Sequence, residues 1–412
     1  VASGRGSGVE GARRAGPPAE WYAQATPGQR RDCWLLMSER FAPDPAKLRS
    51  AREAFERAAG TAEEPRAEIA LRRAMTSPRA RLLQRFAASE QGMRFLVDLR
   101  AELLPHLKEE PRLLPLDAEL EQLFSTWFDV GFLELQRISW DSPASLIEKL
   151  IRYEAVHDIR SWSDVKNRLD SDRRCYGFFH PRLPGEPLIF VEVALTDGIS
   201  DSITPLLDET AALADPRQAT TAIFYSISNT QTGLRGVSFG DSLIKHVVET
   251  LRTEFPKLRT FATLSPIPGL RAWVERQAPA LLDQLDATPP PDLARVRAAA
   301  AEAAVVLKAL EQPLALEPKS PLRSLLLAWA AQYLGRELQQ GKPLDAVARF
   351  HLGNGARIEQ LDWAGDPSPK GLRQSYGLMV NYLYDLKRLD RHRTLLARGK
   401  VPISKAVEEL YL

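Results

Sequence analysis

Apolar residues recur every three or four positions in the first third of the chain, with charged residues between them. This spacing is typical of amphipathic helices. It is clearest in three segments, residues 45–60, 68–77 and 80–107. No unit of about 20–50 residues recurs, which favours a helical bundle over a solenoid. We therefore predict an all-α N-terminal domain over residues 19–130, preceded by a flexible tail at 1–18.

After Gly131 the apolar positions gather into short runs rich in β-branched and aromatic residues, which is typical of strands. These runs cover residues 132–140, 176–180, 187–195, 221–228 and 259–265. Helical patterns separate some of them, and an Ala- and Leu-rich helical stretch at about 279–346 interrupts the strands. We therefore predict an α+β fold, in which a mixed-sheet domain with a helical insertion covers residues 131–412.

Composition narrows the class of protein. A length of 412 residues, with 44% hydrophobic and 26% charged residues, predicts a globular chain of two domains. The net charge of +2 comes from interspersed residues, so nucleic acid is not an expected partner. No run reaches the roughly 18 apolar residues that cross a membrane. Cys33, Cys175 and the scattered histidines match neither a disulfide framework nor a metal site.

The ends of the chain carry no recognisable address. Residues 1–18 lack the apolar core of a secretory signal, and the final residues, EELYL, are not a peroxisomal SKL sequence. We therefore expect a cytoplasmic location.

The segment from Ile223 to Gly240 runs from a predicted strand into a glycine-containing loop, and a predicted helix follows. Free backbone N–H groups and the positive end of a helix dipole favour an anion there, such as the pyrophosphate of a nucleotide or of coenzyme A. The loop matches neither GxGxxG nor GxxxxGK[ST]. From this pattern alone, an ordinary connection between a strand and a helix remains the alternative.

Five blocks follow in order along the chain: residues 179–195, 223–240, 259–273, 350–363 and 376–386. In this order they resemble the malonyl-CoA decarboxylase family, most strongly in the sequences SPIPG, HLGNGA and GLMVNY. The resemblance runs from about Trp140 to Leu386, whereas the helical part matches only in general character. It implies a carboxy-lyase of malonate and fatty acid metabolism that converts malonyl-CoA to acetyl-CoA and carbon dioxide without biotin or a metal.

The resemblance also implies an acetyltransferase-like (GNAT) catalytic domain. In that fold two neighbouring strands splay apart, and the pantetheine of coenzyme A lies against unpaired backbone. We expect the helical domain to serve as a scaffold that assembles a homo-oligomer, either a dimer or a tetramer.

Loss of carbon dioxide leaves an electron pair that the thioester carbonyl accepts as an enolate, which must be stabilised and then protonated on carbon. His351 stands where a helical pattern meets GNG, and a helix C-terminus favours imidazolium and raises the pKa. Its position alone favours a surface or capping histidine over a catalytic one. The resemblance implies that His351 is the catalytic histidine, and Asn354 in the same GNG is a further site candidate.

Ser265 opens the SPIPG turn, where a serine commonly bonds its own backbone. The resemblance implies instead that Ser265 pairs with the histidine and donates a hydrogen bond to the substrate carboxylate or thioester oxygen. Tyr384 matches a tyrosine that the family places near the site, and Asn381 lies close by in sequence. Each can orient His351 or contact the acyl group, and a purely structural tyrosine remains the alternative.

The coenzyme A contacts are expected in two neighbouring stretches. Residues 226–228 lie along pantetheine, and backbone N–H groups of residues 231–236 bind the pyrophosphate, where glycines permit close approach and an arginine adds charge. The candidates are Ser226, Ile227, Ser228, Gln231, Thr232, Gly233, Leu234, Arg235 and Gly236. Ser238 stands where the family can have an acidic residue, so no role of that acid is assigned.

Two other functions use the same features. An acyl-CoA-dependent N-acetyltransferase needs an acceptor amine and a base, and fold alone does not exclude it. A non-catalytic regulator that binds coenzyme A needs neither His351 nor Ser265. Release of carbon dioxide from malonyl-CoA alone distinguishes a decarboxylase from both.

Overall fold

The computed structural model describes residues 20–237, 243–284 and 303–411. The chain divides into two compact units. The first, here called the helical unit, contains residues up to Glu134 together with Phe178–Leu188 and Asn229–Gly240. The second, the sheet unit, contains Leu135–Gly177, Ile189–Ser228 and the residues from Asp241 onward. Short segments from the middle of the chain therefore belong to the helical unit.

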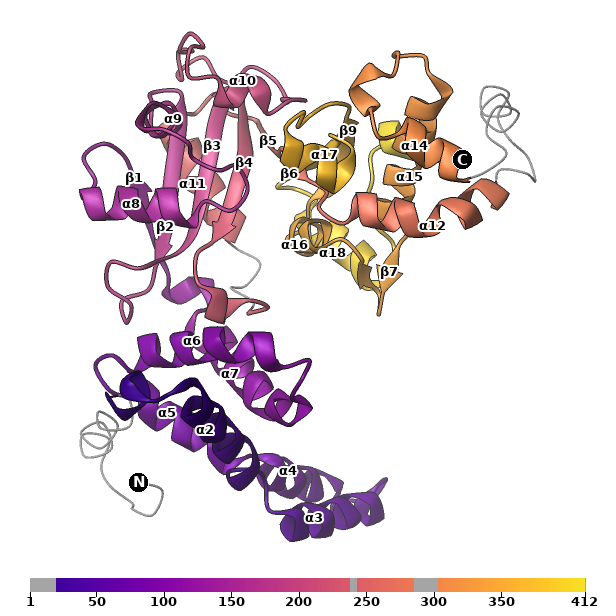
Figure 1. The fold of residues 1–412 in the computed structure, drawn as a ribbon. Helices are drawn as coiled ribbons and strands as arrows, with labels where there is room; N and C mark the ends of the chain where they lie inside the picture. The colour runs from indigo at the N-terminus through magenta and orange to yellow at the C-terminus, as the bar shows by residue number, and fades with distance from the viewer. Residues whose placement is uncertain (1–19, 238–242, 285–302, 412) are drawn as a thin grey trace. The chain divides into compact units, whose positions relative to one another are not determined.

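Figure 1 labels the helices of the helical unit, and side-chain caps mark where three of them begin. Thr26 and Gln29 form a reciprocal capping box, while Asp44 and Ser77 accept hydrogen bonds from the first-turn N–H groups that follow them. The helices are α2 (Pro27–Arg40), α3 (Pro45–Ala58), α4 (Glu64–Met75), α5 (Pro78–Ala87), α6 (Gly92–Leu103) and α7 (Leu114–Trp127).

Burial is uneven among these helices. Helices α6 and α7 supply fully buried side chains, including Leu96, Leu99, Leu120 and Phe124. Neither α3 nor α4 contains a buried residue, and Ile69 and Met75 of α4 are half exposed. The predicted all-α N-terminal region is confirmed, with a core near α6 and α7.

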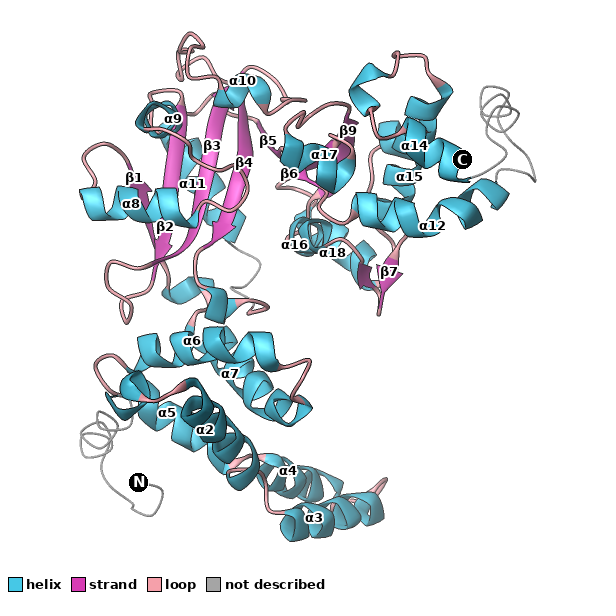
Figure 2. Ribbon diagram, in the orientation of Figure 1, coloured by secondary structure: helices cyan, strands magenta, loops and turns pink. Residues whose placement is uncertain are grey.

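The sheet has the strand order β1-β2-β3-β4-β5-β10-β6, and β9 pairs with β10. Figure 2 shows these strands among the helices of the chain. The strands are β1 (Glu134–Ile138), β2 (Arg173–Phe179), β3 (Pro187–Thr196), β4 (Thr221–Asn229), β5 (Thr260–Thr263), β6 (Ser265–Pro266), β9 (Arg357–Asp362) and β10 (Met379–Leu383). Strands β4 and β5 are parallel, whereas β10 is antiparallel to β5, β6 and β9. The predicted mixed sheet is confirmed.

Helices cover the sheet and make up most of the described part of the predicted insertion, of which residues 285–302 lie outside the described residues. Helices α8 and α9 pack Ile147, Leu150 and Val165 against Phe190 of β3, while helix α11 follows β4 in the chain. Between β6 and β9, helix α12 includes Pro279, where the sequence pattern placed the start of the insertion. The helices are α8 (Ala144–Tyr153), α9 (Trp162–Arg168), α10 (Thr204–Leu207), α11 (Leu243–Glu254), α12 (Leu270–Gln284), α14 (Ala303–Ala309), α15 (Pro321–Gly335), α16 (Ala346–Gly353), α17 (Pro369–Ser375), α18 (Leu389–Ala397) and α19 (Lys405–Glu408), with a β7–β8 hairpin (Leu338–Gln339, Lys342–Pro343) before α16.

The sheet opens between β4 and β5. Their register runs from Thr221↔Thr260 to Phe224↔Thr263, and the N–H of Leu264 then donates to the Phe224 carbonyl. Beyond this point β4 continues to Asn229, while the other segment turns away, so that Ser265 pairs with Val380 of β10. The GNAT-type resemblance implied such a divergence of neighbouring strands.

Two further properties concern only the described residues. Every helix there is too short or too polar to traverse a lipid bilayer. In the same part of the chain, no three His, Cys, Asp or Glu side chains are grouped as metal ligands. Cys33 and Cys175 are free thiols.

Candidate active site

His351 lies in the last turn of the short helix α16, which begins after Asp345. The Asp345 carboxylate accepts the N–H groups of Val347 and Ala348 and so fixes the start of this helix. His351 is only 4% exposed, and its ring stacks on that of Tyr382 with the centroids 4.7 Å apart. Packing therefore defines the plane of the imidazole.

Both ring nitrogens of His351 have hydroxyl partners. Nε2 lies 3.3 Å from Ser265 Oγ, and Nδ1 lies 2.8 Å from the Tyr384 hydroxyl. Ser265 and His351 are 86 positions apart in the chain, and the pairing of β6 with β10 brings the serine into reach. The structure thus brings together Ser265, His351 and Tyr384, the three residues predicted to be catalytic.

Thr263 extends this chain of hydrogen bonds by one residue. Ser265 Oγ donates to Thr263 Oγ1 over 2.8 Å, and the N–H of Tyr382 donates to the same oxygen over 3.1 Å. Ser265 is therefore directed at other side chains and does not act as a turn residue that bonds its own backbone. The position of its hydroxyl is set by β5 and β10 together.

These contacts assign the tautomer of His351. Burial raises the pKa of Tyr384 above its ordinary range, so its hydroxyl stays protonated and is able to donate to Nδ1. The ring proton then sits on Nε2, which donates to Ser265 Oγ, and the serine donates onward to Thr263.

The prediction that the helix end raises the pKa of His351 is wrong for this structure. Burial lowers the pKa to about 3, because the charged imidazolium loses its hydration in the core. A helix terminus carries only a partial charge, whose effect is modest. The unliganded site therefore holds a neutral histidine at pH 7.

The two asparagine candidates have structural contacts. Asn381 Nδ2 donates to the carbonyls of Thr263 and Ser200, at 2.7 and 3.0 Å. It therefore fixes the backbone beside the site, whereas Tyr384 contacts His351 directly. Asn354 ends α16 and donates from Nδ2 to the Phe350 carbonyl.

Two cavities lie in the sheet unit. Asn354 and Tyr384 line a small one of about 10 Å³, together with apolar residues of α11. A cavity of about 800 Å³ is formed by residues 156–164, 203–209 and 366–373, and its lining includes none of the three predicted catalytic residues.

The side chains of Ser226 and Ser228 share one buried partner. Both hydroxyls are buried and bond the Glu154 carboxylate, at 2.8 and 3.2 Å, while Ile227 between them is partly exposed. At these two serines only the backbone is free to lie along pantetheine. The prediction that residues 226–228 lie along pantetheine therefore concerns their backbone and stays a prediction.

The predicted phosphate loop, residues 231–236, belongs to the helical unit. It contains a single 3-10 turn, Thr232–Leu234, in which the N–H groups of Leu234 and Arg235 donate to carbonyls of the loop itself. These two N–H groups are therefore engaged within the loop, and the binding of pyrophosphate by this run stays a prediction. The buried guanidinium of Arg100 donates to the carbonyls of Gly233 and Arg235, both at 2.9 Å, and fastens the loop to α6.

The remaining loop candidates also have specific roles. Gln231 is buried, accepts from Arg94 and donates to the Pro187 carbonyl. A Cβ on Gly233 would lie 1.9 Å from the Val97 carbonyl oxygen, so this glycine permits packing on α6. Gly236 has φ of +81°, which a side chain disfavours. Ser238 lies outside the described residues.

Sequence reasoning did not identify Thr263, Tyr382 or Glu154. A signal was present for the tyrosine, because Tyr382 and Tyr384 are two positions apart and so share one face of an extended segment. No sequence signal distinguished Thr263 or Glu154, because each resembles an ordinary polar residue at the end of an apolar run.

The fold and the buried serine–histidine pair together describe an α+β protein whose sheet opens beside a hydroxyl–imidazole site. Family models for malonyl-CoA decarboxylase match the chain twice, with the C-terminal domain at residues 131–412 and the N-terminal domain at 41–128. This chain therefore belongs to the malonyl-CoA decarboxylase family. The second match extends the relationship to the helical part, where the sequence resemblance was only general.

Individual relatives agree with this assignment. The mitochondrial malonyl-CoA decarboxylase of the goose Anser anser anser is 38% identical over 338 residues, covering 76% of this chain and 65% of that protein. The mitochondrial malonyl-CoA decarboxylase of the rat is 37% identical, and the match covers 68% of that protein. This chain thus spans about two thirds of the length of these curated relatives.

Two solved structures extend over nearly the whole chain. Malonyl-CoA decarboxylase from Rhodopseudomonas palustris has a TM-score of 0.84 and 43% identity, covering 99% of this chain and 96% of that one. The Agrobacterium vitis protein has the same TM-score and 40% identity, covering 99% and 97%.

Proposed function

We propose that this protein decarboxylates malonyl-CoA to acetyl-CoA and carbon dioxide. The observation that carries the proposal is the buried imidazole of His351 between the hydroxyls of Ser265 and Tyr384. Decarboxylation requires donors that meet developing negative charge in a site shielded from water, and a proton for carbon. These side chains supply both in one place.

In the proposed reaction, the bond between the free carboxylate carbon and the α-carbon breaks, and carbon dioxide leaves. The electron pair moves through the α-carbon onto the thioester oxygen and forms an enolate. Ser265 Oγ–H, released from Thr263, donates to that oxygen or to the carboxylate. The enolate then collapses as its α-carbon takes a proton, so that the reaction consumes one proton for each acetyl-CoA formed.

His351 is the proposed proton donor, although the unliganded imidazole is neutral. A substrate carboxylate beside the ring favours imidazolium, because an opposite charge in a poorly hydrated site raises a histidine pKa. The proton would thus be taken up with the substrate and leave from Nε2 to the α-carbon. Tyr384 keeps the ring oriented throughout by its contact with Nδ1.

The thioester is itself the electron sink, so we propose a reaction without metal or biotin. We also propose that the protein works in a reducing, cytoplasmic environment, for which its two free thiols are suited. We further propose that the protein assembles into a homo-oligomer through its helical unit. This assembly is supported by the absence of buried residues from α3 and α4 and by the half-exposed Ile69 and Met75 of α4.

Incubation in deuterium oxide tests the reaction. With malonyl-CoA and no amine, the protein should form acetyl-CoA that carries one deuterium in its methyl group, detected by mass spectrometry. An N-acetyltransferase would instead leave malonyl-CoA intact and consume acetyl-CoA only when an amine is added. A coenzyme A-binding regulator would do neither.

Substitution of Thr263 by valine tests how the serine is positioned. The change removes the acceptor of the Ser265 hydroxyl but keeps the shape of the side chain, so kcat should fall about tenfold, as for one hydrogen bond of roughly 1.4 kcal/mol. Steady-state kinetics measure the effect. Thr263→Ser keeps the hydroxyl and should retain most of the rate. Equal losses in the two variants would show that Thr263 acts through packing alone.

Gly236→Val tests whether the loop of residues 231–236 binds the pyrophosphate. At φ of +81° a β-branched side chain costs roughly 1–2 kcal/mol, so the loop should relax and the affinity for free CoA should fall about tenfold. Titration calorimetry measures this affinity. The matched control is Gly60→Val, which imposes similar strain at φ of +76° in the turn between α3 and α4. Unchanged affinity in a folded Gly236→Val protein would place the pyrophosphate elsewhere.

A further inference from the structure

Strand β4 continues beyond the point where its neighbour β5 leaves it. The paired register ends at Phe224↔Thr263, and among the described strands only β3 still borders residues 225–229. An edge of this kind presents unpaired backbone N–H and C=O groups in the plane of the sheet. On this side it also lacks the second ladder of hydrogen bonds that supports an interior strand.

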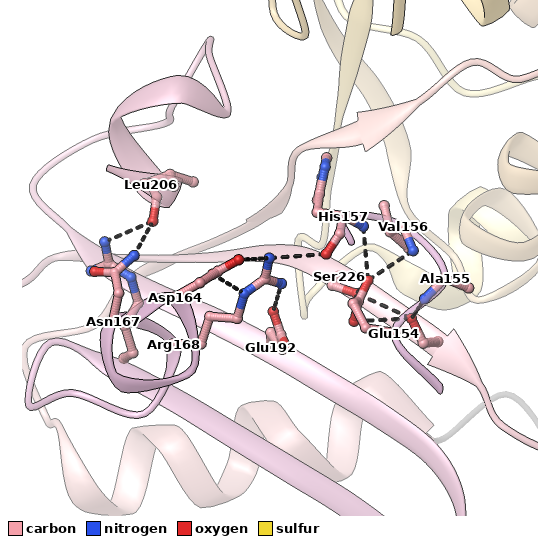
Figure 3. A network of polar contacts seen from close by, with 12 residues as sticks. Glu154, Ala155, Val156, His157, Asp164, Asn167, Arg168, Glu192, Leu206 and Ser226 are labelled. Carbon is pink, nitrogen blue, oxygen red and sulfur yellow. Dashed lines mark hydrogen bonds and ion pairs between the residues drawn. The ribbon is translucent and has the colours of Figure 1, made fainter. Parts of the chain in front are cut away.

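A buried carboxylate supports this stretch of β4 from the face of the sheet. Glu154, which follows helix α8, is 8% exposed. Its oxygens lie 2.8 Å from Ser226 Oγ and 3.2 Å from Ser228 Oγ, and both hydroxyls donate to it. Figure 3 shows the Glu154 carboxylate directed at the serine on the strand.

The loop that carries Glu154 is itself held firmly. The Glu154 carboxylate also accepts the N–H groups of Val156 and His157, at 2.7 and 2.9 Å, and Ala155 N–H donates to Ser228 Oγ. Lys370 Nζ donates to the carbonyls of Ala155 and Val156. The glutamate is therefore a fixed point against which β4 is held.

A buried ion-pair network around Arg168 holds the end of this loop. Arg168 is fully buried and donates to the His157 carbonyl, as well as to the carboxylates of Asp164 and Glu192 (Figure 3). Buried charges of this kind are costly unless they are fully hydrogen-bonded. Their arrangement here fixes where the loop can lie.

The direction of these contacts matters for the strand. Side chains stand roughly perpendicular to a sheet, whereas backbone N–H and C=O groups lie in its plane. Glu154 therefore holds Ser226 and Ser228 without using the edge groups of β4. The strand is kept extended while its open edge remains available to the amide groups of a ligand.

We propose that Glu154 is a positioning residue that holds β4, through Ser226 and Ser228, so that the open backbone edge of the strand is prepared for the pantetheine arm of malonyl-CoA. This inference rests on the proposed function, because it concerns how the substrate of that reaction is held. It predicts that loss of the contact weakens the binding of the arm and leaves the chemistry at Ser265 and His351 unchanged.

The experiment uses Glu154→Gln and a Ser226→Ala/Ser228→Ala double variant. In each, KM for malonyl-CoA should rise and affinity for free CoA should fall by about tenfold, the usual worth of a lost hydrogen bond to a charged group, while kcat changes by less than about threefold. The double variant leaves Glu154 bonded to Val156 and His157 and so disturbs the loop less. If Glu154→Gln does not fold, the KM and CoA affinity of the double variant test the inference. Thr250→Ala, which removes an exposed hydroxyl from α11, is the control.

A truncated substrate separates positioning from general damage. The malonyl thioester of a short alkyl thiol lacks the pantetheine arm, so its kcat/KM should be the same in the variants and the wild type. Equal losses for both substrates, or unchanged CoA affinity in the variants, would overturn this inference alone. A wild-type protein that neither binds CoA nor releases carbon dioxide would overturn the proposed function, and this inference with it.

Discussion

Substitution of His351 by asparagine should lower kcat for malonyl-CoA by roughly 10²–10⁴-fold, the usual contribution of a positioned general acid. Asparagine can keep a polar contact with Ser265 or Tyr384, but it cannot carry a proton to carbon. Affinity for free CoA should be nearly unchanged, since CoA lacks the acyl group on which the imidazole acts. His106→Asn, a histidine substitution in the helical unit, is the matched control. A His351→Asn protein with more than half the wild-type rate would exclude this residue from the mechanism.

The same substitution should change how stability depends on pH. Burial lowers the pKa of His351 to about 3, so between about pH 6.5 and 3 the unfolded chain takes up a proton that the folded chain does not. Folding stability contributed by the neutral histidine is therefore present above pH 6.5 and is lost as the pH falls. Denaturant unfolding at pH 7 and pH 5 should show a smaller loss in His351→Asn than in wild type. Equal losses would indicate a histidine that is already charged when folded.

Substitution of Ser265 by alanine should lower kcat by about 10²–10³-fold, which is typical for the loss of one donor to a developing oxyanion. The change also leaves Nε2 of His351 without its hydroxyl partner. Because both residues act on one transition state, the double variant should be far less impaired than the product of the single effects. Steady-state kinetics on the two single variants and the double variant measure this coupling. Fully multiplicative effects would indicate independent roles.

Local patterns predicted the fold well. Three- and four-residue spacing identified the N-terminal helices, and short β-branched runs identified the strands around Phe190 and Phe224, because periodicity reflects which face of an element is buried. The match of SPIPG and HLGNGA to a family predicted that Ser265 and His351 meet. Spacing alone could not have done so, since the two residues are 86 positions apart.

What sequence could not predict depends on tertiary contacts. The pKa of His351 falls because the ring is enclosed by strands and helices distant in the chain, and the helix end that the sequence showed is a weaker effect. The hydroxyls of Ser226 and Ser228 are directed by Glu154, some 70 residues earlier. Gly233 is needed for packing on α6, although its place in a loop suggested contact with a ligand.

The most direct test of the central claim uses malonyl-CoA with ¹³C in its free carboxylate, supplied to purified protein without any acceptor. We expect labelled carbon dioxide and an equal amount of unlabelled acetyl-CoA from the wild type, with almost none from folded His351→Asn protein. Intact malonyl-CoA after incubation with wild type, or equal release of label by both proteins, would contradict it.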